Sequence, residues 1–254
     1  MIDCHAHLND EKLKNYIYEI NNSSLNIGVN KIINVGYDLQ SSIDAVKIAS
    51  EYENMYAVVG VHPHDAKNYS SEVEQKLENL AKNKKVVAIG EIGLDYHYDL
   101  SPRDVQKDVF IKQIILSHKL SLPIVIHTRE AIGETLDILN EYKQFLTNGV
   151  LIHCFNASLE VLDIVIKNGW YVSFGGAITF KNGNKIVECV KNCPLDRTML
   201  ETDCPYMTPE PYRGQINTPV NIPIIAAKIA EIKQIDVKKV EEVTEKNTIK
   251  FFNL

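Results

Sequence analysis

Histidines and carboxylates gather at the ends of short apolar stretches in this sequence, and these residue types can do chemistry. Six of the eight histidines have this position: His5, His7, His62, His64, His127 and His153. The acidic residues that share it are Glu91, Asp95 and Asp203. If eight stretch ends held roughly three residues each, chance would place only about 0.8 of a histidine there. The pattern therefore predicts one functional site rather than scattered structural histidines.

A pair of histidines at the start of the chain indicates metal binding. His5 and His7 are two residues apart in an apolar stretch, so in a strand both side chains point to the same face, while Cys4 and Ala6 point to the other. Two imidazoles on one face can hold one cation. Such a pair alone is equally typical of a structural site, so the prediction depends on further ligands.

Further ligands are offered by other stretch ends. Glu91 and Asp203 can complete the coordination and neutralise the charge of the metal, and His127 and His153 supply two more imidazoles. Four histidines and two carboxylates are too many for one tetrahedral ion but suit two ions that share a bridging carboxylate. Because the ligand set mixes nitrogen and oxygen without thiolate, zinc, manganese and magnesium are all permitted.

The five cysteines offer an alternative chemistry that the sequence supports less well. Cys4 or Cys154 with a nearby histidine could act as a cysteine nucleophile, but neither lies in a nucleophile-elbow sequence. An odd number of cysteines without paired CxxC motifs argues against a disulfide framework and a zinc ribbon. Cys189 and Cys193 are expected to be buried apolar groups. Cys204 is expected to face away from the metal, because its parity is opposite to that of the preceding aspartate.

The elements that must position these groups are eight apolar runs, each followed by a polar break and a stretch with helical spacing. They are MIDCHAH, KIINVGY, MYAVVGVHP, KVVAIGEIGLD, LPIVIHTR, GVLIHCF, WYVSFGG and TMLETDCP. Short runs rich in Val and Ile are typical of strands buried on both faces, and segments such as Asp104 to Lys119 are long enough for helices. Two more helical patterns occupy residues 219–254. Eight such units in 254 residues predict a single-domain (β/α)8 TIM barrel spanning residues 1–254.

An open doubly wound sheet would also alternate strands with helices. That alternative lacks the glycine-rich phosphate-binding motif that such sheets usually place after the first strand. In a barrel, the active site lies at the carboxyl ends of the strands, where the histidines and carboxylates are found. The sequence therefore favours the barrel.

Charge and hydropathy exclude two broad classes of protein. The formal charge of −6 and the pI of about 5.8 argue against an extended basic face for coating duplex DNA. The first residues lack the basic and apolar segments of a signal peptide, and no apolar run of about 18 residues could span a membrane. We therefore expect a cytoplasmic protein without a membrane partner.

Several motifs together resemble the TatD family of metal-dependent deoxyribonucleases, within the wider amidohydrolase-like barrels. They are IDCHAH, GVHPH, AIGEIGLDY, R-x-x-Q-x-x-x-F at 103–110, LPIVIHTREA, GVLIHCF and MLETDCPYMTPEPYRG followed by NTPVN. The resemblance extends from Ile2 to Asn221. It implies a TIM barrel with two divalent ions and a DNA substrate, cleaved from single-stranded 3′ ends.

The resemblance also implies which residues bind each ion. The first ion would be held by His5, His7, Glu91 and Asp203, and the second by the bridging Glu91 with His127 and His153. His62 and His64 match the histidines that the family has near the site on the third strand. Asn9 departs from an aspartate that many members have there, but it lies beyond the ligands.

Chemical roles follow from a two-metal phosphodiester cleavage. Asp203 is the group expected to orient or deprotonate the attacking water while it binds the first ion. His62 or His64 could hold a non-bridging phosphate oxygen or protonate the leaving oxygen. A purely structural role is the alternative for both histidines.

Substrate contacts are expected from the segment after the eighth strand, where prolines restrict the chain. Tyr206 and Tyr212 could stack on bases, and Arg213 could bind a phosphate. Arg129, two residues after His127, is a second candidate for binding the anion. The alternative for each is stabilisation of a turn or an internal ion pair.

Two other functions remain open from the sequence. The first is a binuclear hydrolase of a small ester, lactone, amide or phosphotriester, although many relatives of that kind bridge their metals with a modified lysine, where this chain has Glu91. The second is a non-catalytic metal-binding scaffold. It is disfavoured because two open-sided ions at a barrel mouth suit catalysis better than stabilisation.

Overall fold

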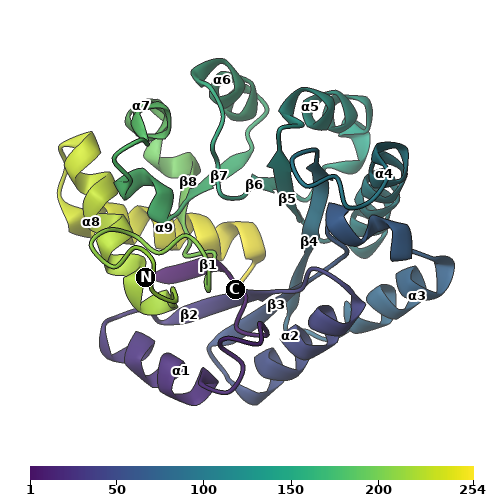
Figure 1. The fold of residues 1–254 in the computed structure, drawn as a ribbon, viewed down its shortest axis with the longest axis horizontal. Helices are drawn as coiled ribbons and strands as arrows, with labels where there is room; N and C mark the ends of the chain where they lie inside the picture. The colour runs from purple at the N-terminus through teal and green to yellow at the C-terminus, as the bar shows by residue number, and fades with distance from the viewer. The chain divides into compact units, whose positions relative to one another are not determined.

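A computed structural model describes residues 1–254 as strands that alternate with helices (Figure 1). The strands are β1 (Ile2–Ala6), β2 (Lys31–Val35), β3 (Met55–Val59), β4 (Val86–Asp95), β5 (Ile124–Arg129), β6 (Val150–Ile152), β7 (Tyr171–Phe174) and β8 (Thr198–Leu200). The helices are α1 (Ile17–Asn26), α2 (Leu39–Glu51), α3 (Ser71–Leu80), α4 (Arg103–Leu120), α5 (Ile132–Glu141), α6 (Leu159–Lys167), α7 (Asn184–Asn192), α8 (Ile222–Lys233) and α9 (Val237–Phe252). Short 3-10 turns are η1 (Pro63–Asn68), η2 (Lys143–Phe145), η3 (Gly176–Thr179), η4 (Leu195–Arg197) and η5 (Pro219–Asn221).

All eight apolar runs form strands, and the strands follow one another in the sheet in the order β1 to β8. The pairs β1–β2, β3–β4, β4–β5, β5–β6 and β7–β8 are parallel. This sequential parallel order is that of a (β/α)8 barrel, because a doubly wound sheet reverses its strand order at a switch point. The predicted helix at 104–119 is α4, and the two C-terminal patterns are α8 and α9.

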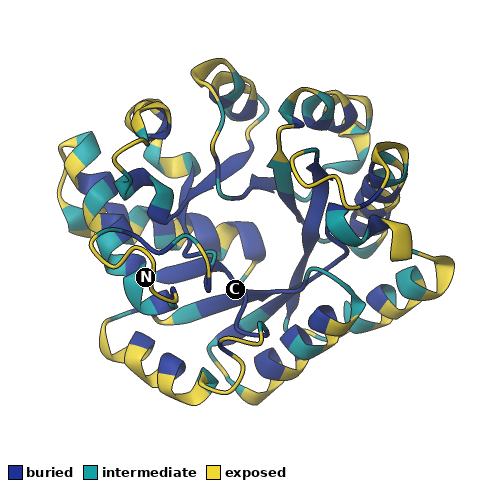
Figure 2. Cartoon of the chain, viewed as in Figure 1, coloured by how far each residue is buried: buried dark blue, intermediate teal, exposed yellow.

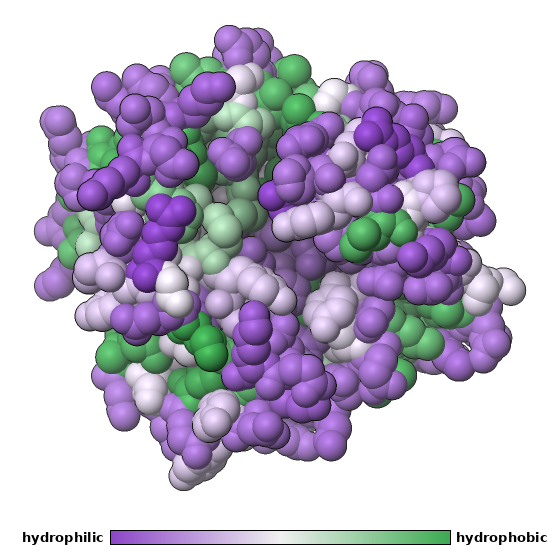
Figure 3. All heavy atoms as spheres, in the orientation of Figure 1, coloured by the Kyte–Doolittle hydropathy of each residue, from purple (hydrophilic) through white to green (hydrophobic).

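The core lies between the strands and the apolar faces of the helices. Figure 2 shows the strands mostly buried and the helices exposed along their outer faces. All ten residues of β4 are buried, as expected for a parallel strand covered on both sides. The face in Figure 3 carries mainly hydrophilic residues with separate hydrophobic patches between them. None of the helices combines the length and the apolar character needed to cross a membrane.

The chain divides into two compact units. The first unit consists of Met1–Asn34 and His153–Leu254, in which α9 packs on β1 and β8, and α6 packs on β7. The second consists of Val35–Ile152, in which α2 packs on β3, and α4 packs on β4. In Figure 1 the helices α2 to α5 lie along one side of the strands β3 to β5.

Gly93 allows β4 and β5 to approach closely at a predicted metal ligand. It pairs with His127 and has a φ of +143°, which L side chains rarely adopt. A Cβ at this position would clash with the carbonyl oxygen of His127. Glycine is therefore required for the two strand backbones to lie this close.

We expect Gly93→Ala to lower the free energy of unfolding by roughly 2 kcal/mol or more, because the new methyl group meets a strand backbone at an unfavourable φ. Urea denaturation measures the change. Gly133→Ala is the matched control, since Gly133 lies in α5 and a Cβ there has no atom within 4 Å. The control should be neutral or stabilising by up to about 1 kcal/mol. Equal stability of the two variants would contradict the prediction.

Candidate metal centre

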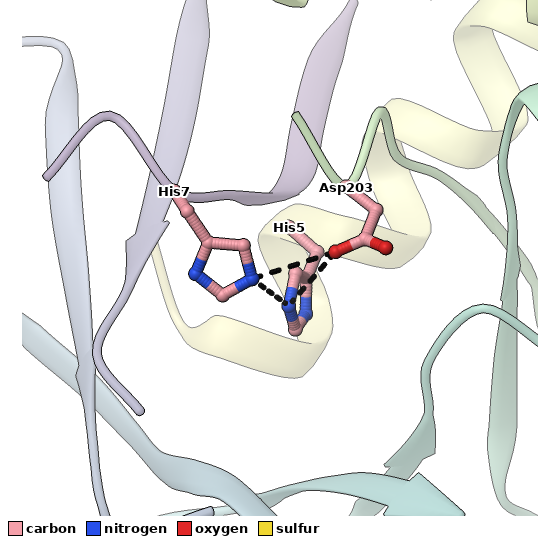
Figure 4. Close-up of side chains that lie close together, drawn as sticks. All are labelled: His5, His7 and Asp203. Atoms are coloured by element: carbon pink, nitrogen blue, oxygen red, sulfur yellow. Dashed lines mark hydrogen bonds and ion pairs between the residues drawn. The ribbon is translucent and has the colours of Figure 1, made fainter. Parts of the chain in front are cut away.

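His5, His7 and Asp203 point their polar atoms at one another within the first unit (Figure 4). The Nε2 atoms of His5 and His7 are 3.3 Å apart, and Oδ1 of Asp203 lies 3.8 Å from His5 Nε2 and 3.4 Å from His7 Nε2. His5 is fully buried and His7 nearly so, whereas the Asp203 side chain is 17% exposed. The group is therefore open to solvent on its carboxylate side.

Backbone pairing between β1 and the segment after β8 brings these three side chains together. Asp203 donates its N–H to the carbonyl of His5 at 2.9 Å, and His7 donates its N–H to the carbonyl of Cys204 at 2.8 Å. A parallel bridge joins Ala6 to Cys204 between these bonds. Asp203 has a φ of +54°, a left-handed conformation that aspartate tolerates better than most residues. The turn at Asp203 thus directs its carboxylate toward the two histidines.

A buried carboxylate beneath the group fixes the same pairing. Asp3 is fully buried and accepts two hydrogen bonds from Thr202, from its N–H at 3.0 Å and its hydroxyl at 2.5 Å. Burial raises the pKa of Asp3 to about 7, although the bonds from Thr202 oppose this. Asp3 therefore ties β1 to the residue that precedes Asp203.

His153, the predicted ligand from the end of β6, lies against His5. Their rings are stacked, with centroids 3.9 Å apart and planes at 8°. Nδ1 of His153 is 3.7 Å from Oε2 of Glu201, a fully buried residue whose Oε2 also accepts from the Ser173 hydroxyl at 2.6 Å. Glu201 was not predicted from the sequence. Its signal was its spacing, two residues before Asp203 in the ETD motif.

A second group of titratable side chains lies in the second unit. His62, Asp95 and His127 offer ligand atoms within 4.8 Å of one another. Oδ2 of Asp95 is 3.0 Å from His127 Nε2 and 3.1 Å from His64 Nε2, while Nδ1 of His127 is 3.6 Å from Oε2 of Glu91. The structure thus brings together four predicted site residues and Asp95, which was predicted to lie at a strand end but without a role.

His62 is a neutral ring with a defined proton position. It is 7% exposed, and burial lowers its pKa well below the usual range, with a smaller contribution from the neighbouring His127. Its Nδ1 accepts a hydrogen bond from the backbone N–H of His64 at 3.1 Å. Because Nδ1 accepts, the proton of the neutral ring lies on Nε2.

The residues of the first group fit a divalent ion. Ligand atoms about 2.1 Å from a tetrahedral ion lie about 3.4 Å from one another. The separations among His5 Nε2, His7 Nε2 and Asp203 Oδ1 are 3.3, 3.4 and 3.8 Å. Two nitrogen donors and one carboxylate oxygen suit zinc, manganese and magnesium without choosing among them.

Comparison with known proteins agrees with this chemistry. A family model described as TatD related DNase matches residues 2–253. The chain belongs to the TatD family. A TatD homologue of known structure, YjjV from Escherichia coli K12, has a TM-score of 0.94 and 26% identity, covering 100% of this chain and 98% of that chain. The fold of this TatD-family chain is therefore a (β/α)8 TIM barrel, as predicted.

Curated relatives of this TatD-family chain are metal-dependent hydrolases by name. The "Uncharacterized metal-dependent hydrolase YabD" of Bacillus subtilis (strain 168) is 40% identical over 254 residues, covering 100% of this chain and 99% of the relative. The "Uncharacterized metal-dependent hydrolase YcfH" of Escherichia coli (strain K12) is 33% identical over 257 residues, covering 100% of this chain and 96% of the relative. The chain is thus a metal-dependent hydrolase of the TatD family.

Two of the candidate substrate residues, Arg129 and Tyr206, make contacts with residues outside the two histidine groups. Arg129 places its guanidinium 4.8 Å from the ring of Tyr98. Tyr206 donates its hydroxyl to Asp10 at 3.1 Å, and Tyr206 is 50% exposed. Both side chains are exposed but already in contact with neighbours, and Nζ of Lys12 also lies 5.0 Å from the centre of the Tyr206 ring.

The other two candidates, Tyr212 and Arg213, lie with Tyr206 in the proline-rich segment after β8. Arg213 lies with its guanidinium 4.1 Å from the ring of Phe180, and Tyr212 is 46% exposed. A guanidinium stacked on a ring keeps its planar N–H donors directed to the side, where an anion can bind.

The thiol alternative finds little support. Cys4 and Cys204 are fully buried, and burial raises the pKa of both thiols well above the usual range. Cys189 and Cys193 are each 1% exposed, as expected for apolar side chains. Cys154 is half-buried and stands at a left-handed φ of +46°.

Proposed function

We propose that this chain is a deoxyribonuclease that removes nucleotides from the 3′ ends of single-stranded DNA with the help of two divalent ions. The observation that carries the proposal is the convergence of His5, His7 and Asp203 at 3.3 to 3.8 Å, a metal-binding geometry in a family described as DNase. The family model matches residues 2–253, which supports one catalytic domain along the chain.

The ligand assignment uses both groups of residues. His5, His7 and Asp203 would hold the first ion, and His127 and His153 the second, with Glu91 bridging. Carboxyl ends of barrel strands meet at one face, which supports Glu91 of β4 as a ligand shared with β1, β5, β6 and the segment after β8. The 3.6 Å distance between Glu91 Oε2 and His127 Nδ1 agrees with a common ion.

The bound ions would supply Lewis acidity, which lowers the pKa of a water and stabilises charge on phosphate oxygens. Oδ1 of Asp203 faces the two histidines, so we assign Oδ2 to orienting the attacking water and accepting its proton. His62 offers its Nε2–H as a neutral donor to a non-bridging phosphate oxygen, since its Nδ1 already accepts from His64.

The proposal is tested with one metal-reconstituted preparation and a panel of substrates. A single strand labelled at its 3′ end should release the label as a mononucleotide early in the reaction. At that time the same strand labelled at its 5′ end should still be longer than half its original length. Duplex DNA and RNA should be cut more slowly. If simple esters or lactones are hydrolysed efficiently while no nucleic acid is cut, the chain is instead a small-molecule hydrolase and the proposal is wrong.

Arg213 and Tyr212 are expected to contribute to DNA binding rather than to bond cleavage. Arg213→Ala should weaken oligonucleotide cleavage through a lost phosphate contact. Tyr212→Ala should reduce the free energy of DNA binding by about 1 to 3 kcal/mol if its ring stacks on a base. Hydrolysis of a small chromogenic phosphodiester should change little in both variants. Steady-state kinetics on the two substrates measures the difference.

The control for these variants is Tyr18→Ala, an exposed tyrosine on α1 that carries no proposed role. It should leave both activities at the wild-type level. If both substrates lose activity in parallel in the Arg213 and Tyr212 variants, the segment belongs to the catalytic machinery. If neither substrate is affected, the segment does not bind DNA.

A further inference from the structure

We propose that Asp95 is a positioning residue that fixes the ring orientation and the proton of His127, so that Nδ1 of His127 is presented as a metal ligand. The inference rests on the proposed function in one respect, the assignment of His127 to the second ion. It adds a residue to which no role has been given. Hydrogen bonds hold the Asp95 carboxylate on both of its oxygens, and they determine how the ring of His127 is presented.

The carboxylate of Asp95 is buried, and its two oxygens contact different groups. Asp95 is 1% exposed. Oδ1 accepts hydrogen bonds from the backbone N–H groups of His97 and Tyr98, both at 3.0 Å. Oδ2 faces Nε2 of His127 at 3.0 Å and Nε2 of His64 at 3.1 Å. The plane of the carboxylate is therefore fixed by backbone, while its second oxygen is hydrogen-bonded to His127 and lies at ion-pair distance from His64.

The backbone of Asp95 is also held by hydrogen bonds. Asp95 donates its N–H to Oε1 of Gln106 at 2.9 Å, and Gln106 Nε2 donates back to the carbonyl of Asp95 at 3.2 Å. Gln106 is fully buried in α4. Asp95 also pairs with Arg129 of β5, two residues beyond His127. Asp95 and His127 are thus held at a fixed separation by two neighbouring strands and a helix.

This geometry determines which nitrogen of His127 carries its proton. An ionised carboxylate only accepts hydrogen bonds, so His127 Nε2 must be the donor to Oδ2. In the neutral ring the lone pair then lies on Nδ1, the atom 3.6 Å from Oε2 of Glu91. A metal ion needs that lone pair. A carboxylate that fixes the other nitrogen of a metal-binding histidine typically raises metal affinity about 10- to 100-fold.

The competing explanation is that Asp95 binds an ion directly, together with His62 and His127. Against this, Nδ1 of His62 accepts from the His64 backbone, which places its proton on Nε2. A direct site at Asp95 would also turn the lone pair of His127 toward Asp95 and its proton toward Glu91. The two explanations therefore predict opposite protonated nitrogens for His127 when the metal is bound.

Asp95→Asn separates the two. Because Oδ1 accepts from two backbone N–H groups, the amide oxygen of asparagine should take that place and turn its NH2 group toward His127. A donor at this position requires Nε2 of His127 to accept, so the proton moves to Nδ1. Long-range ¹H–¹⁵N correlation spectra report the protonated nitrogen directly, in the zinc-loaded wild type and in both metal-free proteins at alkaline pH, where the ring is neutral. We expect Nε2–H in the wild type and Nδ1–H in the variant.

Metal titration gives a second readout that does not depend on activity. Asp95→Asn should weaken binding of one ion by about 10- to 100-fold and leave the other unchanged, with the full number of ions still bound at saturation. Glu130→Gln is the matched control, because Glu130 is exposed and pairs with His97 at 2.7 Å through the same kind of contact. It should change neither the spectrum of His127 nor the affinity.

Three outcomes would overturn the inference. A wild-type His127 protonated on Nδ1 would reject it without any variant, and so would an unchanged affinity in a folded Asp95→Asn protein. Loss of one ion at saturating metal would make Asp95 a ligand. If His127→Ala binds both ions like the wild type, the ligand assignment of the proposed function fails instead. Absence of DNA cleavage with the expected spectra and affinities would leave the positioning role intact.

Discussion

Asp203→Asn is expected to slow DNA cleavage by about 10²- to 10⁴-fold at saturating metal, while DNA affinity stays close to that of the wild type. The amide keeps the shape of the side chain but lacks the charge and the basicity needed to accept a proton from water. Because Oδ1 of Asp203 also faces His5 and His7, the metal concentration must be raised until occupancy is restored.

Single-turnover kinetics and fluorescence anisotropy with a labelled single strand measure the two quantities. Asp163→Asn is the matched control, since Asp163 is an exposed aspartate of α6 in the same unit. Its rate should equal that of the wild type. An unchanged rate in Asp203→Asn at full metal occupancy would exclude the role of Asp203 in activating the water.

Glu91→Gln should reduce activity at least about 10³-fold, because a shared carboxylate contributes several kcal/mol of charge stabilisation to both ions. His153→Ala should mainly weaken binding of the second ion. Elemental analysis after reconstitution and dialysis should therefore give two ions per chain for the wild type, about one for His153→Ala, and fewer than one for Glu91→Gln.

The two variants also differ in how excess metal acts on them. Activity of His153→Ala should return in part when the metal concentration is raised, since Glu91 and His127 still offer ligands. Glu91→Gln should not recover, because its amide cannot bridge two cations. If both variants retain two ions and full activity, the ligand assignment is wrong.

The eight strands were predictable because buried parallel strands leave a strong pattern, a short run of Val and Ile with turns at both ends. The common face of His5 and His7 followed from the two-residue period of a strand. Asp203 was predictable as a residue at a strand end, but its left-handed turn was not. That turn depends on hydrogen bonds to β1, almost the whole chain away.

The residues that hold the ligands from behind were harder to predict. Asp95 and Glu201 each stand near a predicted ligand in the sequence, yet their partners, His127 and His153, come from other strands. Which carboxylate faces which imidazole depends on rotamers and on strand register. A single sequence does not specify rotamers or strand register directly. The contact between Arg213 and Phe180 was missed for the same reason.

The bond between Asp3 and Thr202 joins residues 199 positions apart, and this separation matters while the chain is being made. At about 5 to 20 residues per second, a nascent chain takes roughly 10 to 40 s to extend from His5 to Asp203. During that interval His5 and His7 have no carboxylate partner from the end of the chain. A metal ion met on the ribosome would find the two imidazoles and at most Glu91, and it would dissociate more readily than from the complete site. Loading of the first ion is therefore a late event that waits for Asp203, and it depends on the metal available at that moment.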